Sequence, residues 1–265
     1  MGIDPRTGDD TAMSLLDRFA LDGKVAIITG ASSGLGAGFA RALSSAGAQV
    51  LLAARRVDKL EALADELAAE GRSVATVACD VADPNSCAEA VRAALDAFGR
   101  VDILVNNAGV GTAVPALKET PEEFRSVVDV NLNGTYWMAK ECAAVMEPGS
   151  SIVNIASVLG LTAGYAPQAA YTATKTAVIG LTRDLAHQWG SRRGIRVNSL
   201  CPGYFRSEMT DEIPAPMMES IEGSTILGRL GRQHELDAAL LFLASDASSF
   251  VTASTVVVDG GMTGH

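Results

Sequence analysis

Short runs of aliphatic residues alternate with longer amphipathic stretches along almost the whole chain. The runs are rich in Val, Ile, Leu and Ala and are bounded by Gly, Asp, Asn or Pro, which is typical of strands. They predict strands at Val25–Thr29, Gln49–Ala54, Ser73–Cys79, Ile103–Asn106, Ser151–Ala156, Arg196–Leu200 and Thr255–Val258. Continuous aliphatic runs favour strands that are buried on both faces, as in a parallel sheet covered by helices.

Between these runs, the apolar positions follow a helical period. In Val57–Ala69, leucines recur three and four positions apart, and charged residues occupy the opposite side of the expected helix. The same pattern predicts helices at Cys87–Phe98 and Glu235–Ala244. Strands that alternate with helices at this spacing predict right-handed crossovers, and therefore an α/β fold with one parallel sheet.

No linker, repeat or low-complexity tract interrupts this alternation, so we expect one domain over residues 21–265. Residues 1–20 are expected to form an N-terminal tail. Because Met13 can serve as a start, Met1–Ala12 is interpreted as a cloning remnant or a disordered tail. The long stretch from Gly203 to about Leu230 has no pattern, and such connections are usually functional. We therefore expect a substrate-binding loop over residues 204–230.

Composition and charge exclude several classes of protein. The 265 residues are 48% hydrophobic and carry a net charge of −10, which argues against disorder and against nucleic acid or anionic membranes as partners. No apolar run reaches the roughly 18 residues of a membrane helix. The four cysteines form no C-x-x-C pair, which favours free thiols in a reducing cytoplasm. The three histidines have no zinc-ligand spacing, so we expect no metal.

A glycine-rich turn separates the first predicted strand from an apolar helical stretch. Backbone N–H groups at such a helix N-terminus bind phosphate, and glycine lets the backbone approach a pyrophosphate closely. The spacing is G-x-x-x-G-x-G rather than the widespread G-x-G-x-x-G, and a glycine cluster alone also fits an ordinary turn. The strand before it and the helix after it favour a dinucleotide site, with contacts at Gly30, Ser32, Ser33, Gly34, Leu35 and Gly36.

The end of the second predicted strand indicates which dinucleotide binds. An acidic residue there suits the 2′-hydroxyl of NAD, whereas arginine suits the 2′-phosphate of NADP. The chain has Arg55 and Arg56 at this point and no carboxylate before Asp58. The alternative is an ordinary solvated helix start. We expect NADP(H) to be preferred, with NAD(H) as the less favoured cofactor.

Tyr171 and Lys175 are four positions apart at the start of an apolar helical stretch, so they share a helix face. A nearby cation lowers the pKa of tyrosine from about 10 toward the working range of a general acid or base. Ser157 follows the fifth predicted strand, at the edge where open parallel sheets bind ligands. Its hydroxyl can bind a substrate carbonyl, although a Tyr/Lys pair with this spacing is common by itself.

Taken together, these motifs resemble the short-chain dehydrogenase/reductase family. The residues that carry the resemblance follow the family's order between about Leu21 and Gly264. They are Thr29–Gly36, Asp80, Val81, Asn106, Asn107, Ala108, Gly109, Asn131, Ser157, Tyr171, Lys175, Pro202 and Gly203. The resemblance implies a Rossmann-like, doubly wound sheet of seven parallel strands in the order 3-2-1-4-5-6-7, with helices on both faces.

The resemblance also implies a role for each matching residue. Tyr171 would be the general acid/base, Lys175 would lower its pKa and bind the nicotinamide ribose, and Ser157 would polarise the carbonyl. Asn131 would hold a proton-relay water near Lys175. The further cofactor contacts that it implies are Asp80, Val81, Asn107, Ala108, Gly109, Pro202 and Gly203.

Two positions depart from the family's pattern. Ser157 and Tyr171 are 14 positions apart, one more than is common, and we expect the loop Leu161–Gln168 to absorb the extra residue. Ser207 stands where threonine often follows the Pro-Gly turn, and it keeps the hydroxyl.

Several of these residues also have a simpler structural interpretation. Asn106 and Asn107 could cap a turn, Asp80 could begin a helix, and Cys201 is expected to be a small buried side chain. Leu159, Tyr165 and Tyr204 flank the predicted site and are candidates for the substrate pocket.

The sequence therefore predicts an NADP(H)-dependent oxidoreductase that interconverts a secondary alcohol and a ketone or aldehyde. One alternative is a 3-oxoacyl thioester reductase acting on acyl-carrier-protein or CoA thioesters, for which Arg192, Arg193 and Arg196 form a small basic cluster. Sugar, polyol and hydroxysteroid dehydrogenases also stay open. An alternative of another class is a regulatory protein that senses NADP(H) without turnover, although a complete Ser/Tyr/Lys set argues against it.

The resemblance also implies a homotetramer, with a homodimer as the alternative. It places the helices expected at Asn131–Met146 and Tyr171–Trp189 at one interface. Trp137, Met138 and Leu181 are candidates for that interface, and they fit the core equally well.

Overall fold

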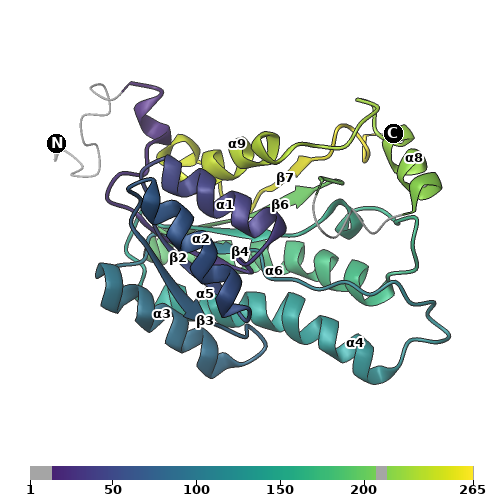
Figure 1. The fold of residues 1–265 in the computed structure, drawn as a ribbon, viewed down its shortest axis with the longest axis horizontal. Coiled ribbons are helices and arrows are strands. Elements are labelled where there is room, and N and C mark those ends of the chain that lie inside the picture. Colours follow the sequence, from purple (N-terminus) through teal and green to yellow (C-terminus); the bar gives the residue numbers. More distant parts are fainter. Residues whose placement is uncertain (1–13, 207–213, 265) are drawn as a thin grey trace.

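Seven parallel strands form one sheet in the order β3-β2-β1-β4-β5-β6-β7 (Figure 1). The computed structural model describes residues 14–206 and 214–264. The strands are β1 (Val25–Thr29), β2 (Gln49–Ala54), β3 (Val74–Ala78), β4 (Ile103–Asn106), β5 (Ser151–Ile155), β6 (Arg196–Pro202) and β7 (Thr255–Val258). The predicted sheet and its strand order are confirmed.

Three strands differ from the predicted ones at their ends. β3 lacks Ser73 and Cys79, β5 lacks Ala156, and β6 continues beyond Leu200 to Pro202. The extension of β6 arises because β7 pairs with it to its end, where Pro202 lies opposite Val258. Sequence patterns do not reveal this pairing, since a proline normally signals the end of a strand.

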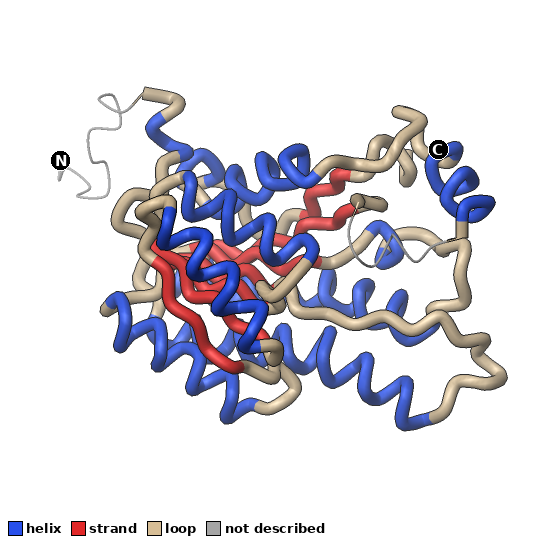
Figure 2. Tube along the Cα trace, in the orientation of Figure 1, coloured by secondary structure: helices blue, strands red, loops and turns tan. Residues whose placement is uncertain are grey.

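Helices cover both faces of the sheet (Figures 1 and 2). On one face lie α1 (Gly34–Ser45), α2 (Val57–Ala69) and α9 (Gln233–Ala244), which bury Phe39, Leu60 and Leu240 in one apolar cluster. On the other face lie α3 (Pro84–Phe98), α5 (Gly134–Val145) and α6 (Ala169–Arg193), which bury Val91, Met138 and Leu185. Met138 is therefore a core residue, while Trp137 and Leu181 are only partly buried against the same cluster.

Four predicted helices differ at their ends. α3 begins three residues earlier than expected, at Pro84, because the carboxylate of Asp83 accepts a hydrogen bond from the backbone N–H of Asn85. α9 begins at Gln233 rather than Glu235, and α6 extends the expected Tyr171–Trp189 helix at both ends. The helix expected at Asn131–Met146 is a π-helical turn, Asp129–Asn133, followed by α5.

The sequence patterns missed two helices. α4 (Pro121–Val128) is short, and its start carries a capping box in which Thr120 Oγ1 accepts from the N–H of Glu123 while the Glu123 carboxylate accepts from the N–H of Thr120. α8 (Ala215–Gly223) lies within the stretch expected to be irregular. Its prolines and methionines obscure the helical period, and Ile221 is the buried residue that holds it.

Two sequence expectations, on Met1–Ala12 and on Ser207, lie outside the described residues. Over residues 14–206 and 214–264, no helix has the length and apolar character needed to cross a membrane.

The strand order changes direction between β1 and β4, which are hydrogen-bonded neighbours. The segments that leave these two strands diverge toward opposite faces of the sheet, because α1 covers one face and α5 the other (Figure 1). Such a point at the carboxyl ends of parallel strands is where open α/β sheets bind ligands.

Candidate active site

The turn between β1 and α1 places a helix N-terminus at the carboxyl edge of the sheet. Gly30 and Gly34 have φ angles of +66° and +53°, which residues with a Cβ rarely adopt. A Cβ on Gly36 would lie 2.4 Å from the carbonyl oxygen of Gly30, so the helix packs closely on its own turn. No side chain caps α1 at Ser33, which keeps its first backbone N–H groups available for a phosphate.

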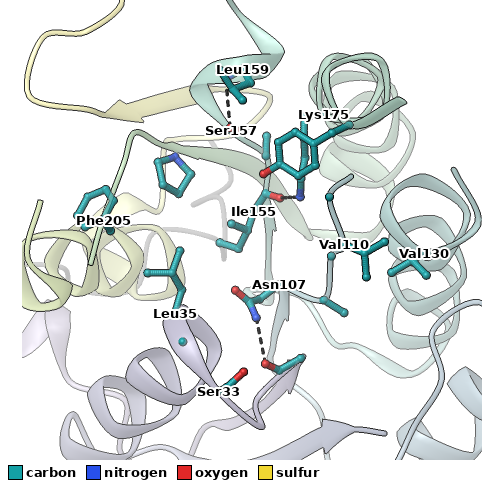
Figure 3. A pocket seen from close by; sticks show the side chains of 18 of the residues that line it. Ser33, Leu35, Asn107, Val110, Val130, Ile155, Ser157, Leu159, Lys175 and Phe205 are labelled. Atoms are coloured by element: carbon teal, nitrogen blue, oxygen red, sulfur yellow. Dashed lines mark hydrogen bonds between the residues drawn. The ribbon is translucent and has the colours of Figure 1, made fainter. Parts of the chain in front are cut away.

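Asn107 fixes this turn against the end of β4. Its side-chain amide donates to the carbonyl oxygen of Thr29 at 3.0 Å and to that of Gly30 at 3.3 Å, the bond drawn in Figure 3. In return, Thr29 Oγ1 accepts from the backbone N–H groups of Asn107 and Ala108, both at 3.0 Å. The turn-cap interpretation of Asn107 is therefore correct for its side-chain amide, although the residue also lines the cavity described below.

Two arginines follow β2 beside this turn. Arg55 and Arg56 are both exposed. The guanidinium of Arg56 donates to Ser32 Oγ at 3.1 Å and to Ser33 Oγ at 2.5 Å. Two cations and two hydroxyls in one place fit a phosphate monoester through charge-assisted hydrogen bonds. This is the position expected for the 2′-phosphate, so the donor set fits NADP(H).

Asp80 and Val81 follow β3 on the same side of the cleft. Asp80 Oδ1 accepts from the N–H of Ala82 at 3.1 Å, and the backbone N–H of Asp80 donates to Ser86 Oγ at 3.1 Å. Val81 is buried against α5, where a Cβ on Gly134 would lie 2.7 Å from its side chain. The local turn thus holds both residues at the cleft.

Ser157, Tyr171 and Lys175 come together on the other side of the cleft. Ser157 begins a short 3₁₀ turn, Val158–Gly160, and its Oγ accepts from the N–H of Leu159 at 3.1 Å (Figure 3). The Tyr171 hydroxyl interacts with Ser157, which favours the ionised phenol. The Lys175 Nζ lies 5.6 Å from the centre of the Tyr171 ring.

The 14-residue spacing between Ser157 and Tyr171 does not separate them. A Cβ on Gly160 would lie 2.9 Å from the backbone of Lys175, so the 3₁₀ turn packs directly on α6. Thr176 Oγ1 also donates to the Gly160 carbonyl at 3.0 Å.

Burial determines the protonation of both groups on α6. It raises the pKa of the Tyr171 phenol, and the hydrogen bond with Ser157 only opposes this rise. It also lowers the pKa of Lys175 to about 8. Burial, and not the neighbouring cation, therefore dominates the pKa of Tyr171 in this structure.

Lys175 is held by the backbone of β5. Its Nζ donates to the carbonyl oxygen of Ile155 at 2.8 Å (Figure 3), and the side chain is buried. The bond fixes the ammonium beneath the tyrosine, and the remaining N–H groups can donate to a ligand in the cleft.

Asn131 lies behind the cleft and is fully buried. Its side-chain amide makes two 2.8 Å hydrogen bonds to the backbone N–H and carbonyl of Val110, and donates to Thr174 Oγ1 at 3.2 Å. It thereby ties the segment after β4 to α6. Asn131 sits in the π-helical turn, a local irregularity that is often found at functional sites.

The residues after β6 form the floor of the site. Gly203 is packed so closely that a Cβ would lie 2.8 Å from Asp259 Cα, and its N–H donates to the Val258 carbonyl at 2.9 Å. Cys201 is fully buried, as expected, and burial raises the pKa of its thiol to about 11.

A cavity of about 760 Å³ joins these groups, extending from Ser33 and Leu35 past Asn107 to Ser157 and Leu159 (Figure 3). Leu159 and Tyr204 line it, whereas Tyr165 is half-exposed and does not. The predicted site residues that line it are Gly30, Ser32, Ser33, Gly34, Leu35, Arg55, Arg56, Asp80, Val81, Asn107, Ala108, Gly109, Ser157, Tyr171, Lys175, Pro202 and Gly203. Gly36 and Asn131 support the cavity from behind.

Sequence reasoning missed several residues at the far end of the cavity. Val110 and Gly111 directly follow the Asn-Asn-Ala-Gly segment, so their place in the sequence could have identified them as lining residues. Met217 and Ile221 come from the unpredicted α8. Elsewhere, the described residues include no group of three His, Cys, Asp or Glu side chains that could hold a metal ion.

Comparisons with known proteins agree with this geometry. The family model described as enoyl-(acyl carrier protein) reductase matches residues 30–263. A gluconate 5-dehydrogenase from Gluconobacter oxydans is 38% identical over 257 residues, covering 95% of this chain and 99% of the relative.

Solved structures show the same similarity. A short-chain type dehydrogenase/reductase from Mycobacterium marinum is 38% identical, with a TM-score of 0.90 over 94% of this chain and 99% of the other. A gluconate 5-dehydrogenase from Burkholderia cenocepacia, in complex with NADP and tartrate, is 36% identical, with a TM-score of 0.89 over 95% and 100% of the two chains.

Proposed function

Because this chain belongs to the short-chain dehydrogenase/reductase family, we propose that it interconverts a secondary alcohol and a ketone or aldehyde with NADP(H). The observation that carries the proposal is the joint placement of Ser157, Tyr171 and Lys175 on one wall of a cavity whose other end is the glycine turn. Such a cavity spans both a proton donor and a phosphate site. The gluconate 5-dehydrogenase that was solved with NADP supports the choice of cofactor.

Ser157 and Tyr171 bind the oxygen of the substrate. Ser157 Oγ already accepts the Leu159 N–H, so its own proton can be donated to a carbonyl oxygen. The Tyr171 phenol keeps its proton at neutral pH because burial raises its pKa, which suits a general acid in the reducing direction. NADPH supplies the hydride for the carbonyl carbon when it is bound, and NADP⁺ accepts it in the reverse direction.

Lys175 stabilises the charge that develops on the tyrosine. When Tyr171 gives its proton to the substrate oxygen, the phenolate forms next to the Lys175 ammonium, which is 5.6 Å from the ring centre. With a pKa of about 8, Lys175 is mainly charged at neutral pH. Its N–H groups not used by Ile155 are available to the cofactor ribose.

Asn131 acts as a positioning residue. Both ends of its amide are occupied by Val110 and Thr174, so the side chain fixes the cleft wall against α6. We propose that any relay water near Lys175 is held by the backbone of this turn rather than by the Asn131 amide.

Arg55 and Arg56 would select NADP(H) over NAD(H). They are the cationic side chains at the end of β2, and they stand beside Ser32 and Ser33, which complete an oxyanion site. Asp80 and Val81 would contact the adenine, and Pro202 and Gly203 would face the nicotinamide.

A 3-oxoacyl thioester reductase is the second candidate, and the 38% identical 3-oxoacyl-[acyl-carrier-protein] reductase of Pseudomonas aeruginosa supports it. Its acyl-carrier partner is acidic and needs a basic surface. Of the proposed cluster, Arg192 and Arg193 are exposed, but Arg196 is buried and donates to the carbonyl oxygens of Leu243 and Ser245. Two arginines remain for docking, which makes this candidate the weaker one.

We further propose that the enzyme works in the cytoplasm and forms an oligomer. Four cysteines without a disulfide, all buried, suit a reducing cytoplasm. Trp137 and Leu181 are partly buried on α5 and α6, and they support a homotetramer or homodimer through this face. Light scattering of the purified protein tests the assembly.

The direct test is the absorbance of NADPH with a panel of ketones, aldehydes and alcohols. The proposal requires NADPH oxidation by at least one carbonyl compound, or NADP⁺ reduction by an alcohol. Binding of NADPH without turnover of any panel member would instead support a cofactor-sensing regulatory protein.

A further inference from the structure

The two ends of the cavity differ in charge. At the glycine-turn end, the charged lining residues are Arg55, Arg56 and Asp80. Beyond Ser157 and Tyr171, none of the described lining residues is charged. That end is where a substrate must lie, because the hydroxyls that receive its oxygen form the boundary between the two ends.

The substrate end is mainly aliphatic. Val110, Val158 and Leu159 come from the segments after β4 and β5, and Met217 and Ile221 come from α8. The polar side chains there, apart from the two hydroxyls that bind the reacting oxygen, are Gln168 and Tyr204. Hydrocarbon therefore forms most of the surface that faces a substrate substituent.

This apolar wall is held in place before any ligand binds. Val158 and Leu159 are buried in a cluster with Met262 from the C-terminal turn, and Tyr171 and Tyr204 pack against it. A Cβ on Gly164 would lie 3.0 Å from Leu159, so the following loop also supports this side chain. A preorganised wall loses little conformational entropy on binding.

The helix that closes the other side is anchored as well. Ile221 is 1% exposed. Just after α8, the N–H of Leu227 donates to the Gly260 carbonyl at 3.1 Å, and a Cβ on Gly261 would lie 2.7 Å from the Ile226 side chain. The C-terminal turn thus holds both apolar surfaces of the substrate end.

A polyol or sugar acid is a poor match for these walls. Each hydroxyl that leaves water needs a hydrogen-bond partner, and a carboxylate needs a cation or several donors. Gln168 and Tyr204 cannot satisfy the several hydroxyls of a sugar chain, and the described lining offers no cation beyond Tyr171. A hydrocarbon substituent needs no partner and releases water from the aliphatic surface.

We infer that the substrate is an uncharged ketone, or the corresponding secondary alcohol, whose alkyl or aryl substituent lies against Val110, Leu159 and Met217. This inference rests on the proposed function. In the reducing direction, the carbonyl carbon gains the hydride of NADPH and the oxygen gains the proton of Tyr171. The ketone becomes a secondary alcohol, NADPH becomes NADP⁺, and solvent returns the proton to the tyrosine.

The test compares 4-phenyl-2-butanone with 5-oxogluconate as substrates, each with saturating NADPH. The expected kcat/KM for the aryl ketone is at least about 100-fold higher, since single methylenes in such a pocket already discriminate about 10-fold or more. Higher kcat/KM for 5-oxogluconate would overturn the inference and leave the proposed function intact. No turnover of either compound or of the wider carbonyl panel would overturn both.

Leu159 and Leu161 provide a matched pair of variants. Leu159→Ala should lower kcat/KM for 4-phenyl-2-butanone about 10-fold or more, whereas Leu161→Ala, at a half-exposed position outside the cavity, should change it less than about twofold. A cooperative thermal transition and unchanged NADPH affinity establish that each variant is folded. If Leu159→Ala does not fold, Met217→Ala removes apolar surface from α8 and should lower the same constant. Unchanged kcat/KM in the folded variant would contradict the inference.

Discussion

The ammonium nitrogen of Lys175 lies 5.6 Å from the centre of the Tyr171 ring. The two residues are one helical turn apart on α6, as their spacing predicts, with Lys175 buried and Tyr171 partly buried. Burial keeps the phenol protonated and lowers the pKa of the ammonium to about 8. Tyr171 can therefore donate its proton, and the Lys175 ammonium stabilises the phenolate that remains.

Burial of Lys175 makes the stability of the cofactor-free protein depend on pH. The pKa of this lysine is about 8 in the folded protein, whereas that of a solvated lysine is 10.5. Below pH 8 both states hold the proton and the folded state bears the full cost of the buried charge. Between pH 8 and 10.5 the unfolded state holds more protons, so the free energy of unfolding rises with pH.

Lys175→Met removes this dependence. Between pH 7.5 and 9.5, the free energy of unfolding of the wild type should rise by about 2 kcal/mol relative to the variant. Urea denaturation of both proteins at the two pH values measures the difference, and titrations of other groups cancel in it. Parallel changes in the two proteins would mean that Lys175 does not titrate in this range.

Arg55 and Arg56 determine the choice of cofactor in this account. Replacing both by alanine removes charge-assisted hydrogen bonds to the 2′-phosphate and should raise the KM for NADPH about 10- to 100-fold. The KM for NADH should stay within about twofold. Arg92→Ala, an exposed arginine on α3 outside the cavity, is the control. Equal losses with the two cofactors, or a wild type that prefers NADH, would refute this assignment.

Gly36 tests the close packing of α1 on its turn. A Cβ there would lie 2.4 Å from the Gly30 carbonyl oxygen and 2.5 Å from Asn107 Nδ2, so Gly36→Ala should cost about 2 kcal/mol or more of stability and weaken NADPH binding. Gly190→Ala is the control, because a Cβ at that position in α6 meets nothing within 4 Å. It should be neutral or stabilise by up to about 1 kcal/mol. If chemical denaturation shows that Gly36→Ala and Gly190→Ala change the free energy of unfolding equally, the packing argument is contradicted.

The sequence predicted the strands and the carboxyl-edge site well because aliphatic runs and glycine turns are local signals. β1, β2, β4 and β7 begin and end where expected. Ser157 and Tyr171 lie close together although 13 residues separate them in the chain. Ser157 is positioned by the end of β5, and Tyr171 lies in the first turn of α6, so the local signals of these two elements were enough to place both.

The features that the sequence did not reveal depend on contacts between distant segments. The acidity of Tyr171 follows from burial rather than from its spacing to Lys175. Arg196 looks like part of a basic cluster, but the carbonyl oxygens of Leu243 and Ser245 bind it inside the protein. Likewise, α8 is held by the buried Ile221 rather than by a clear helical pattern, and Tyr165 lies outside the cavity that it flanks in sequence.

Turnover by Tyr171→Phe tests the central claim most directly. The variant keeps the ring and loses the hydroxyl that interacts with Ser157, while Tyr165→Phe, at a half-exposed position outside the cavity, is the control. With a ketone that the wild type reduces, Tyr171→Phe should lower kcat at least about 100-fold and leave NADPH affinity within about twofold, and Tyr165→Phe should match the wild type. A Tyr171→Phe variant that oxidises NADPH as fast as the wild type would contradict the assignment of Tyr171 as the proton donor.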